Sequence, residues 1–274
     1  MKLISKLFGK ASAEPAAPAR QGRTAEVGWL LDSNEAQFLW GAPKRVRTFE
    51  RNADHAKAVN NCPAYLDYEA HMFEVPCPVD LRVKFQRDAQ GRMALVNPDG
   101  DRSGVRMSHM PKLLTMSPPN EWRHPDRPIV QIVTPYVFVA DEPVWMTQGP
   151  PVQHYAADPW PGLLIGGRLP IHIWPRTMMW AFEWWDMSRE LVLKRGEPWF
   201  YVNFETTDPS RPVRLVEAEL TPELKEYRTG MSGVTNYVNR TYSLFKVAEE
   251  RRPAKLLTPK VRARPAEAEA AEEA

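Results

Sequence analysis

Apolar and polar residues alternate regularly in residues 75–85, and this pattern predicts a β-strand with one buried and one exposed face. The apolar face holds Val79, Leu81, Val83 and Phe85, and the polar face holds Asp80, Arg82, Lys84 and Gln86. Turn-forming residues follow at positions 88–91, and residues 93–96 are apolar enough to return as a partner strand. We therefore expect an antiparallel hairpin in this part of the chain.

Short apolar segments separated by proline or glycine continue from residue 129 to residue 205. They cover residues 129–133, 136–140, 163–165, 171–174, 178–185, 191–194 and 199–205. Pro135 separates the first two, and because proline cannot donate a ladder hydrogen bond we expect a bulge or an edge position there. Strands this short and this closely spaced predict a mainly β fold, as a β-sandwich or jelly-roll-like single domain.

Helix signals lie near the two ends of this β-rich region. Residues 56–68 are expected to hold a helical turn. A stronger signal begins at Thr221, a favourable N-cap that precedes Pro222 at the first helical position. The apolar residues that follow predict a C-terminal helical segment up to residue 251, broken into two pieces by a pair of glycines.

The composition changes at both ends of the chain, and these changes set the expected domain boundaries. We expect a flexible N-terminal segment at residues 1–23, a β-rich globular domain at residues 24–251 and a disordered charged tail at residues 252–274. The tail is first basic and then acidic. The whole chain has a net charge of only +2, so nucleic-acid binding finds no support beyond the basic part of this tail.

Overall composition narrows the class of protein further. The chain has 274 residues, enough for one large domain, and its 27 prolines are about twice the usual share, which suits short strands. Cys62 and Cys77 form no CxxC pair, which favours a reducing, cytoplasmic location. No apolar run reaches the roughly 18 residues of a membrane-spanning helix, so we expect no transmembrane segment.

Ten tryptophans are many for this length, and eight of them lie between residues 122 and 199. Such rings either fill a core or form a platform for a ligand. Trp180 and Trp184 share one face of a predicted strand, which indicates core packing, whereas Trp185 lies on the opposite face and is the better candidate for an exposed ring. The candidate ligand-binding residues are Arg168, His172, Trp174 and Trp185.

Arg168 and His172 are the polar members of this set. Arg168 follows two glycines, which permit the backbone to approach an anion closely. His172 is expected on the same strand face as Trp174. The alternative interpretation of His172 is a half-buried histidine that is satisfied by a neighbouring backbone group.

The sequence His124-Pro125-Asp126 matches the HxD spacing of iron-dependent oxygenases built on a double-stranded β-helix. His172 or His154 would supply the distal histidine, and such an iron site would support a 2-oxoglutarate-type oxygenase. The flanking residues are typical of a polar turn, however, and two specified positions also arise by chance. The alternative is a protein with no cofactor.

Two sequence blocks resemble a group of known proteins. Residues 61–68 read Asn-Cys-Pro-Ala-Tyr-Leu-Asp-Tyr, and residues 72–81 end in a Pro-x-Asp-Leu strand. Residues 194–202, Lys-Arg-Gly-Glu-Pro-Trp-Phe-Tyr-Val, form the second block. These blocks resemble uncharacterised proteins of tailed phages and marine bacteria. The resemblance implies a phage or prophage origin, with a location in the host cytoplasm, and implies no catalytic residues.

The functional hypothesis is a non-catalytic, phage-type protein that binds a protein partner or assembles with its own copies through its β surface. Its basis is the large number of aromatic residues beside the lack of a recognised catalytic motif in the sequence. One alternative is the iron-dependent oxygenase that uses His124, Asp126 and His172. Another is a carbohydrate-binding module that uses Trp185 or Trp174.

Overall fold

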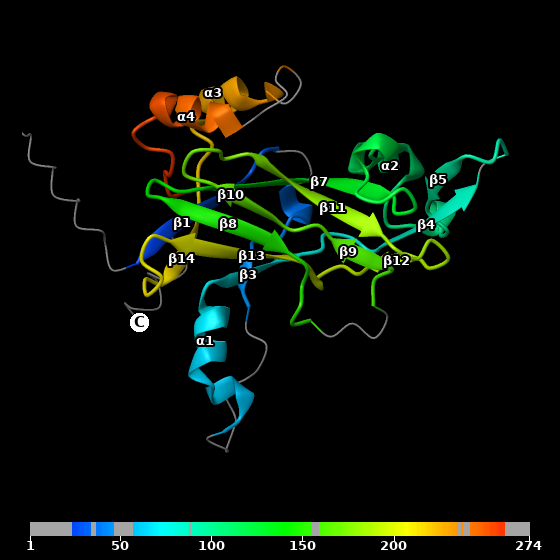
Figure 1. Ribbon diagram of the computed structural model, residues 1–274, viewed down its shortest axis with the longest axis horizontal. Helices are drawn as coiled ribbons and strands as arrows, with labels where there is room; N and C mark the ends of the chain where they lie inside the picture. Colours follow the sequence, from blue (N-terminus) through cyan, green and yellow to red (C-terminus); the bar gives the residue numbers. More distant parts are fainter. Residues whose placement is uncertain are drawn as a thin grey trace, which may run out of the picture.

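Two β-sheets dominate the chain and face each other, and a small third sheet lies at one end (Figure 1). The computed structural model describes residues 24–33, 37–46, 57–87, 89–154, 159–234, 237 and 242–260. The predicted flexible segment at residues 1–23 lies outside these residues. Within the described part of the chain, no helix has both the length and the apolar character needed to cross a membrane.

Sheet A has the strand order β14, β1, β7, β11, β9, and β6 also pairs with β7. Its strands are β1 (Ala25–Leu31), β6 (Leu114–Met116), β7 (Ile129–Val139), β9 (Gly162–Leu164), β11 (Thr177–Trp184) and β14 (Val213–Glu217). β1 and β14 run parallel, and the other pairs in the sheet are antiparallel. This pairing fits strands that bury one face more deeply than the other.

Pro135 lies where the pairing of β7 with β11 is interrupted. The register passes from Thr177 opposite Val137 to Met179 opposite Val133, so β7 contributes more residues than β11 across this step. The Pro135 carbonyl accepts a hydrogen bond of 2.8 Å from the backbone N–H of Asp32 in the chain after β1. The predicted irregularity at Pro135 is confirmed as a bulge in β7.

Sheet B has the strand order β10, β8, β13, β3, β2, and all its pairs are antiparallel. Its strands are β2 (Lys44–Arg45), β3 (Met72–Pro76), β8 (Val144–Gly149), β10 (Gly167–Pro170) and β13 (Pro198–Thr206). The prediction of a strand at residues 171–174 is wrong. The Pro170 carbonyl accepts from the N–H groups of Ile173 and Trp174, at 3.0 and 2.7 Å, and closes a turn there.

The third sheet is small and contains the predicted hairpin. It consists of β12 (Leu191–Leu193), β4 (Leu81–Arg87) and β5 (Met93–Val96), in the order β12, β4, β5. Leu81, Val83 and Phe85 are buried, while Arg82 and Gln86 are exposed, which confirms the alternation. The predicted strand at residues 75–85 is divided, since β3 ends in sheet B before β4 begins in the third sheet.

The core lies between sheets A and B and is rich in aromatic rings. Phe138 of β7 and Phe204 of β13 meet across it, with ring centroids 5.7 Å apart. The apolar face of β11 is buried throughout and consists of Met178, Trp180, Phe182 and Trp184. The chain is therefore a mainly β, sandwich-like single domain, and the assignment of Trp180 and Trp184 to its core is confirmed.

Helices α3 (Pro222–Met231) and α4 (Tyr242–Arg251) lie beside one end of sheet A (Figure 1). The Thr221 hydroxyl accepts from the N–H of Leu224 at 3.2 Å, which confirms the predicted cap. Leu224 packs with Leu30 and Val137 of sheet A. The other helices are α1 (Pro63–Ala70), α2 (Met110–Leu113) and the 3-10 turns Gln37–Leu39, Val59–Asn61, Gly100–Arg102, Met107–His109 and Pro119–Glu121.

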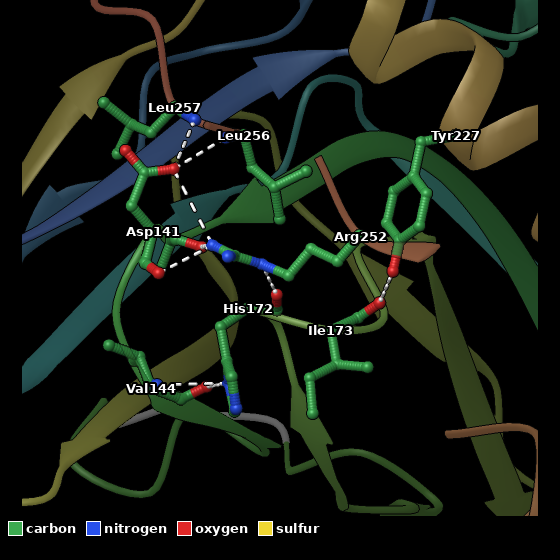
Figure 2. Close-up of polar contacts among 9 residues, drawn as sticks. Asp141, Val144, His172, Ile173, Tyr227, Arg252, Leu256 and Leu257 are labelled. Atoms are coloured by element: carbon green, nitrogen blue, oxygen red, sulfur yellow. Dashed lines mark hydrogen bonds and ion pairs between the residues drawn. The ribbon is translucent and has the colours of Figure 1, made fainter. Parts of the chain in front are cut away.

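The chain after α4 stays packed against the domain, so the domain boundary predicted at residue 251 is placed too early. Leu256 and Leu257 are 1% and 4% exposed and pack with sheet A. Their N–H groups donate to one oxygen of Asp141, at 2.6 and 3.0 Å (Figure 2). Apolar packing and the shared Asp141 carboxylate thus attach Leu256 and Leu257 to the domain, although both residues were expected in the disordered tail. Residues 261–274 of the predicted tail lie outside the described residues.

Candidate functional site

Trp185 is a large, half-exposed aromatic side chain directly after β11. Trp185 is 54% exposed, whereas Trp184 before it is buried. The backbone N–H groups of Trp185 and Asp186 both donate to the Pro161 carbonyl, at 2.9 and 3.0 Å. Two hydrogen bonds therefore fix the backbone that carries the exposed ring to Pro161, the residue before strand β9.

A buried carboxylate beneath this ring holds it in place. Glu183 of β11 is fully buried, although it lies on the outer face of sheet A. The indole N–H of Trp185 donates to its Oε1 at 2.8 Å. Arg123 donates from Nε to Oε2 at 2.7 Å and from Nη2 to Oε1 at 3.1 Å, in a two-pronged arrangement that is stronger than a single contact.

The charges around Glu183 keep it ionised. Hydrogen bonding from Arg123 holds the pKa of the Glu183 carboxyl below its usual range, helped by the Trp185 N–H and by the positive charges of Arg123 and Arg127, while burial acts in the opposite direction. Arg127 places Nη1 3.8 Å from Oε1 and its guanidinium 5.9 Å from the centre of the Trp185 ring. The carboxylate thus connects two arginines and an indole into one rigid group.

Replacing Glu183 with glutamine would keep the shape of the side chain and remove its charge. We expect Glu183→Gln to lower the free energy of unfolding by about 1 kcal/mol near neutral pH, a modest loss because both arginines are half exposed to water. The folded-state pKa lies below the unfolded value of about 4.3, so this contribution is complete above that pH and is lost as the pH falls through the folded-state pKa.

Urea unfolding of the wild type and of Glu183→Gln, at neutral and at strongly acidic pH, measures the difference in their free energies of unfolding. The matched control is Glu205→Gln, which alters an ion pair with Arg168 whose two side chains are each about half exposed. A difference between wild type and Glu183→Gln that grows as the pH falls would contradict the assignment.

The surface around Trp185 combines apolar and charged groups. On the outer face of sheet A, the ladder pairs Glu183–Ile129, Ala181–Gln131 and Met179–Val133 follow one another along β11 and β7. Val133 and Met187 are 44% and 38% exposed. The name Trp185 face is used below for seven exposed residues: Arg123, Asp126 and Arg127 before β7, Val133 within β7, and Trp185, Asp186 and Met187 after β11.

Arg168 and His172, the polar residues of the predicted set, both contact the Trp145 ring. The Arg168 guanidinium is 5.0 Å from the ring centre, and its Nη2 donates to Glu205 at 2.8 Å. The imidazole of His172 meets the same ring edge-on at 5.1 Å. Arg168 therefore pairs with a carboxylate of β13, which leaves the predicted anion site without its main cation.

His172 and Trp174 belong to the turn after β10 and are buried, each 8% exposed. The Nδ1 atom of His172 lies 2.9 Å from the Val144 carbonyl (Figure 2). Burial lowers the pKa of the His172 imidazole. The Trp174 ring packs on Phe245 of α4 at 5.1 Å. The alternative interpretation of His172 as a histidine satisfied by backbone matches this geometry, and Trp174 is no open platform for a sugar.

The residues of the hypothetical iron site do not form a metal-binding group. His124 and Asp126 lie in an exposed turn, where the Asp126 N–H donates to Nδ1 of His124 at 3.2 Å. His172 is buried beside Val144, as described above. Across the described residues, no three His, Cys, Asp or Glu side chains gather in a way that could hold a metal ion.

Sequence reasoning identified Trp185 but missed the group that holds it. Arg123 lies sixty positions before Glu183, so no local pattern connects them. The only signal was the alternation of β11, which placed Glu183 and Trp185 opposite the core. A comparison of the chain with protein families, with characterised proteins and with solved structures found no match.

Proposed function

We propose that this protein is a non-catalytic assembly protein that binds a second copy of itself through the Trp185 face. The observation that carries the proposal is a half-exposed tryptophan fixed by a buried, doubly paired glutamate. Tryptophan and arginine are the residues that most often dominate the energy of protein interfaces. An aromatic ring that is already held in position loses little conformational entropy on binding, so more of its contact energy becomes affinity.

The mixture of charges on the Trp185 face favours a second copy as the partner. Arg123 and Arg127 stay 59% and 46% exposed while they contact Glu183. Asp126 and Asp186 are exposed as well, and one oxygen of Asp186 accepts from Ser188. In a two-fold dimer the same surface meets itself, so each arginine of one copy can lie opposite an aspartate of the other around the central apolar rings.

The electrostatics of the site support binding over catalysis. A general acid or base works best with a pKa near the operating pH. The pKa of Glu183 is shifted the other way, downward, because Arg123 donates to its charged form. Its hydrogen bonds hold Trp185 and Arg123 in place, which is the role of a positioning residue.

We expect Trp185→Glu to weaken self-association at least about tenfold, because it removes the apolar ring from the centre of the proposed interface and puts a hydrated carboxylate there. Sedimentation velocity over a range of protein concentrations measures the association constant. Val59→Glu is the matched control, since Val59 is also 54% exposed but lies in the 3-10 turn before α1. Circular dichroism of both variants checks that the fold is kept.

A second variant, Trp185→Phe, distinguishes the contribution of the aromatic ring from that of its hydrogen bond to Glu183. It keeps an apolar ring and loses the N–H donor to Glu183. We expect an association constant between those of the wild type and Trp185→Glu. A wild-type protein that stays monomeric at every concentration, or equal association for wild type and Trp185→Glu, would overturn the proposal.

A further inference from the structure

A pocket of about 300 Å³ lies between the end of α1 and the end of β13 in sheet B. Helix α1 extends from the molecule on the side opposite to α3 and α4 (Figure 1). The lining comes from residues 67–71 and 203–209, which the structure describes throughout. Small-molecule sites typically measure about 300 to 1,000 Å³, so this pocket has the size for a ligand with a single ring.

A backbone hydrogen bond joins the two parts of the pocket. The Phe204 N–H donates to the His71 carbonyl at 3.2 Å, so the residue that follows α1 is held against β13. The Phe204 side chain is buried in the core. Because alternate strand residues point to opposite faces, Asn203 and Glu205 lie on the outer face of sheet B. This arrangement brings side chains of α1 and of β13 to the same pocket.

Four polar side chains of the lining make no hydrogen bond or ion pair with the described residues, and they offer both donors and acceptors to a ligand. They are Asp67 and Tyr68, which are exposed, and His71 and Asn203, which are half-buried. The Asp67 carboxylate only accepts, whereas the Tyr68 hydroxyl and the Asn203 amide donate and accept, and a neutral imidazole has one nitrogen of each kind. A hydroxyl group also donates and accepts, so it can pair with every one of them.

The charges of the lining favour a neutral ligand. Among the described residues that form the lining, none is a lysine or an arginine. Glu205 belongs to the lining, but its Oε2 accepts from Nη2 of Arg168 at 2.8 Å, so its charge is already paired. Asp67, the other carboxylate, is exposed to water. An anion would be repelled by Asp67, and a cation would gain little from one hydrated carboxylate.

From these features we infer that the pocket binds a neutral sugar ring. Its hydroxyls pair with Asp67, His71 and Asn203, and one of its apolar faces packs on the Tyr68 ring, which is 49% exposed. The site is distinct from the tryptophans that the sequence suggested for sugar binding. The inference concerns a different surface from the assembly proposal and does not depend on it.

The methyl pyranosides of glucose, galactose, mannose and N-acetylglucosamine test this inference, because they share one ring size and differ in the orientation or substitution of their hydroxyls. Tetrahydropyran is the matched probe, since it has the same ring without hydroxyls. We expect at least one glycoside to bind with a dissociation constant of about 1 mM, as is typical for a ligand of this size, and to shift the side-chain amide signals of Asn203 in a ¹H–¹⁵N spectrum. Asn203→Asp identifies these signals. Tetrahydropyran should bind at least about tenfold more weakly.

Tyr68→Ala tests the stacking surface without a substitution in the core. It should weaken binding of that glycoside about tenfold. Tyr237→Ala is the matched control, because Tyr237 is 88% exposed and lies between α3 and α4. The inference would be overturned if none of the four glycosides shifted the Asn203 signals. Tetrahydropyran binding as tight as that of the glycosides, or equal effects of the two tyrosine substitutions, would overturn it as well.

Discussion

Trp180→Ala is expected to lower the free energy of unfolding by about 3 to 5 kcal/mol. The Trp180 side chain is fully buried, lies parallel to the Phe182 ring at 5.2 Å and meets the Trp160 ring edge-on at 5.5 Å. Removing it leaves a cavity among rigid rings, which cannot collapse to fill the space as flexible side chains would. Urea unfolding followed by circular dichroism measures the loss.

Trp185→Ala provides the matched control, because it removes the same type of side chain from a half-exposed position close to β11. We expect it to cost about 1 kcal/mol, mainly through the lost hydrogen bond to Glu183. Trp180→Phe should fall between the two, since it keeps part of the stacked ring. Similar losses for Trp180→Ala and Trp185→Ala would contradict the placement of Trp180 at the centre of the core.

The core face of β11 could be predicted because strand periodicity assigns alternate residues to opposite faces. Trp180 and Trp184 share the apolar face, and no long-range information is needed to place them there. The same holds for the cap at Thr221, whose hydroxyl serves an N–H three residues later. Each of these features depends on residues close together in the sequence.

The parts that could not be predicted depend on residues far apart in the sequence. Alternation correctly placed Glu183 on the outer face of sheet A, where a carboxylate is expected in water. It is buried because Arg123, sixty positions earlier, covers and neutralises it. Leu256 and Leu257 similarly lie among charged residues with no apolar period, and their burial depends on sheet A and on Asp141.

The predicted ligand-binding set was affected by the same limitation. Trp174 was a candidate platform, but Phe245 of α4 packs against it. The candidate Arg168 pairs with Glu205 of another strand. Trp185 is the member of the set that presents a half-exposed ring, because its own strand and the buried Glu183 determine its position.

Arg252 fastens the chain after α4 to the two β-sheets (Figure 2). Its Nε donates to the His172 carbonyl at 2.6 Å, and its Nη2 donates to the carbonyls of Asp141 at 2.6 Å and Ala140 at 3.3 Å. The same Nη2 lies 3.8 Å from the Asp141 carboxylate, which accepts from the two leucine N–H groups described above. One guanidinium thus joins the turn after β10, the end of β7 and the C-terminal segment.

We expect Arg252→Ala to lower the free energy of unfolding by about 3 kcal/mol, because it leaves partly buried carbonyls without their charged donor. The Arg252 side chain is 18% exposed, so water replaces these bonds only in part. Besides this loss of overall stability, we expect a local loss of protection in the C-terminal segment. Hydrogen exchange at the N–H groups of Leu256 and Leu257 should accelerate more than exchange in β11, since the carboxylate that binds them loses its cationic neighbour.

The neighbouring residue supplies the control for this prediction. Arg251 is exposed at the end of α4, and Arg251→Ala should change stability by less than about 0.5 kcal/mol. Arg252→Lys keeps the charge but cannot reach several carbonyls at once, so its loss should lie between those of the two alanine variants. An Arg252→Lys protein as stable as the wild type would contradict this prediction. In that case the positive charge alone, and not the several hydrogen bonds of the guanidinium, would hold the C-terminal segment on the sheets.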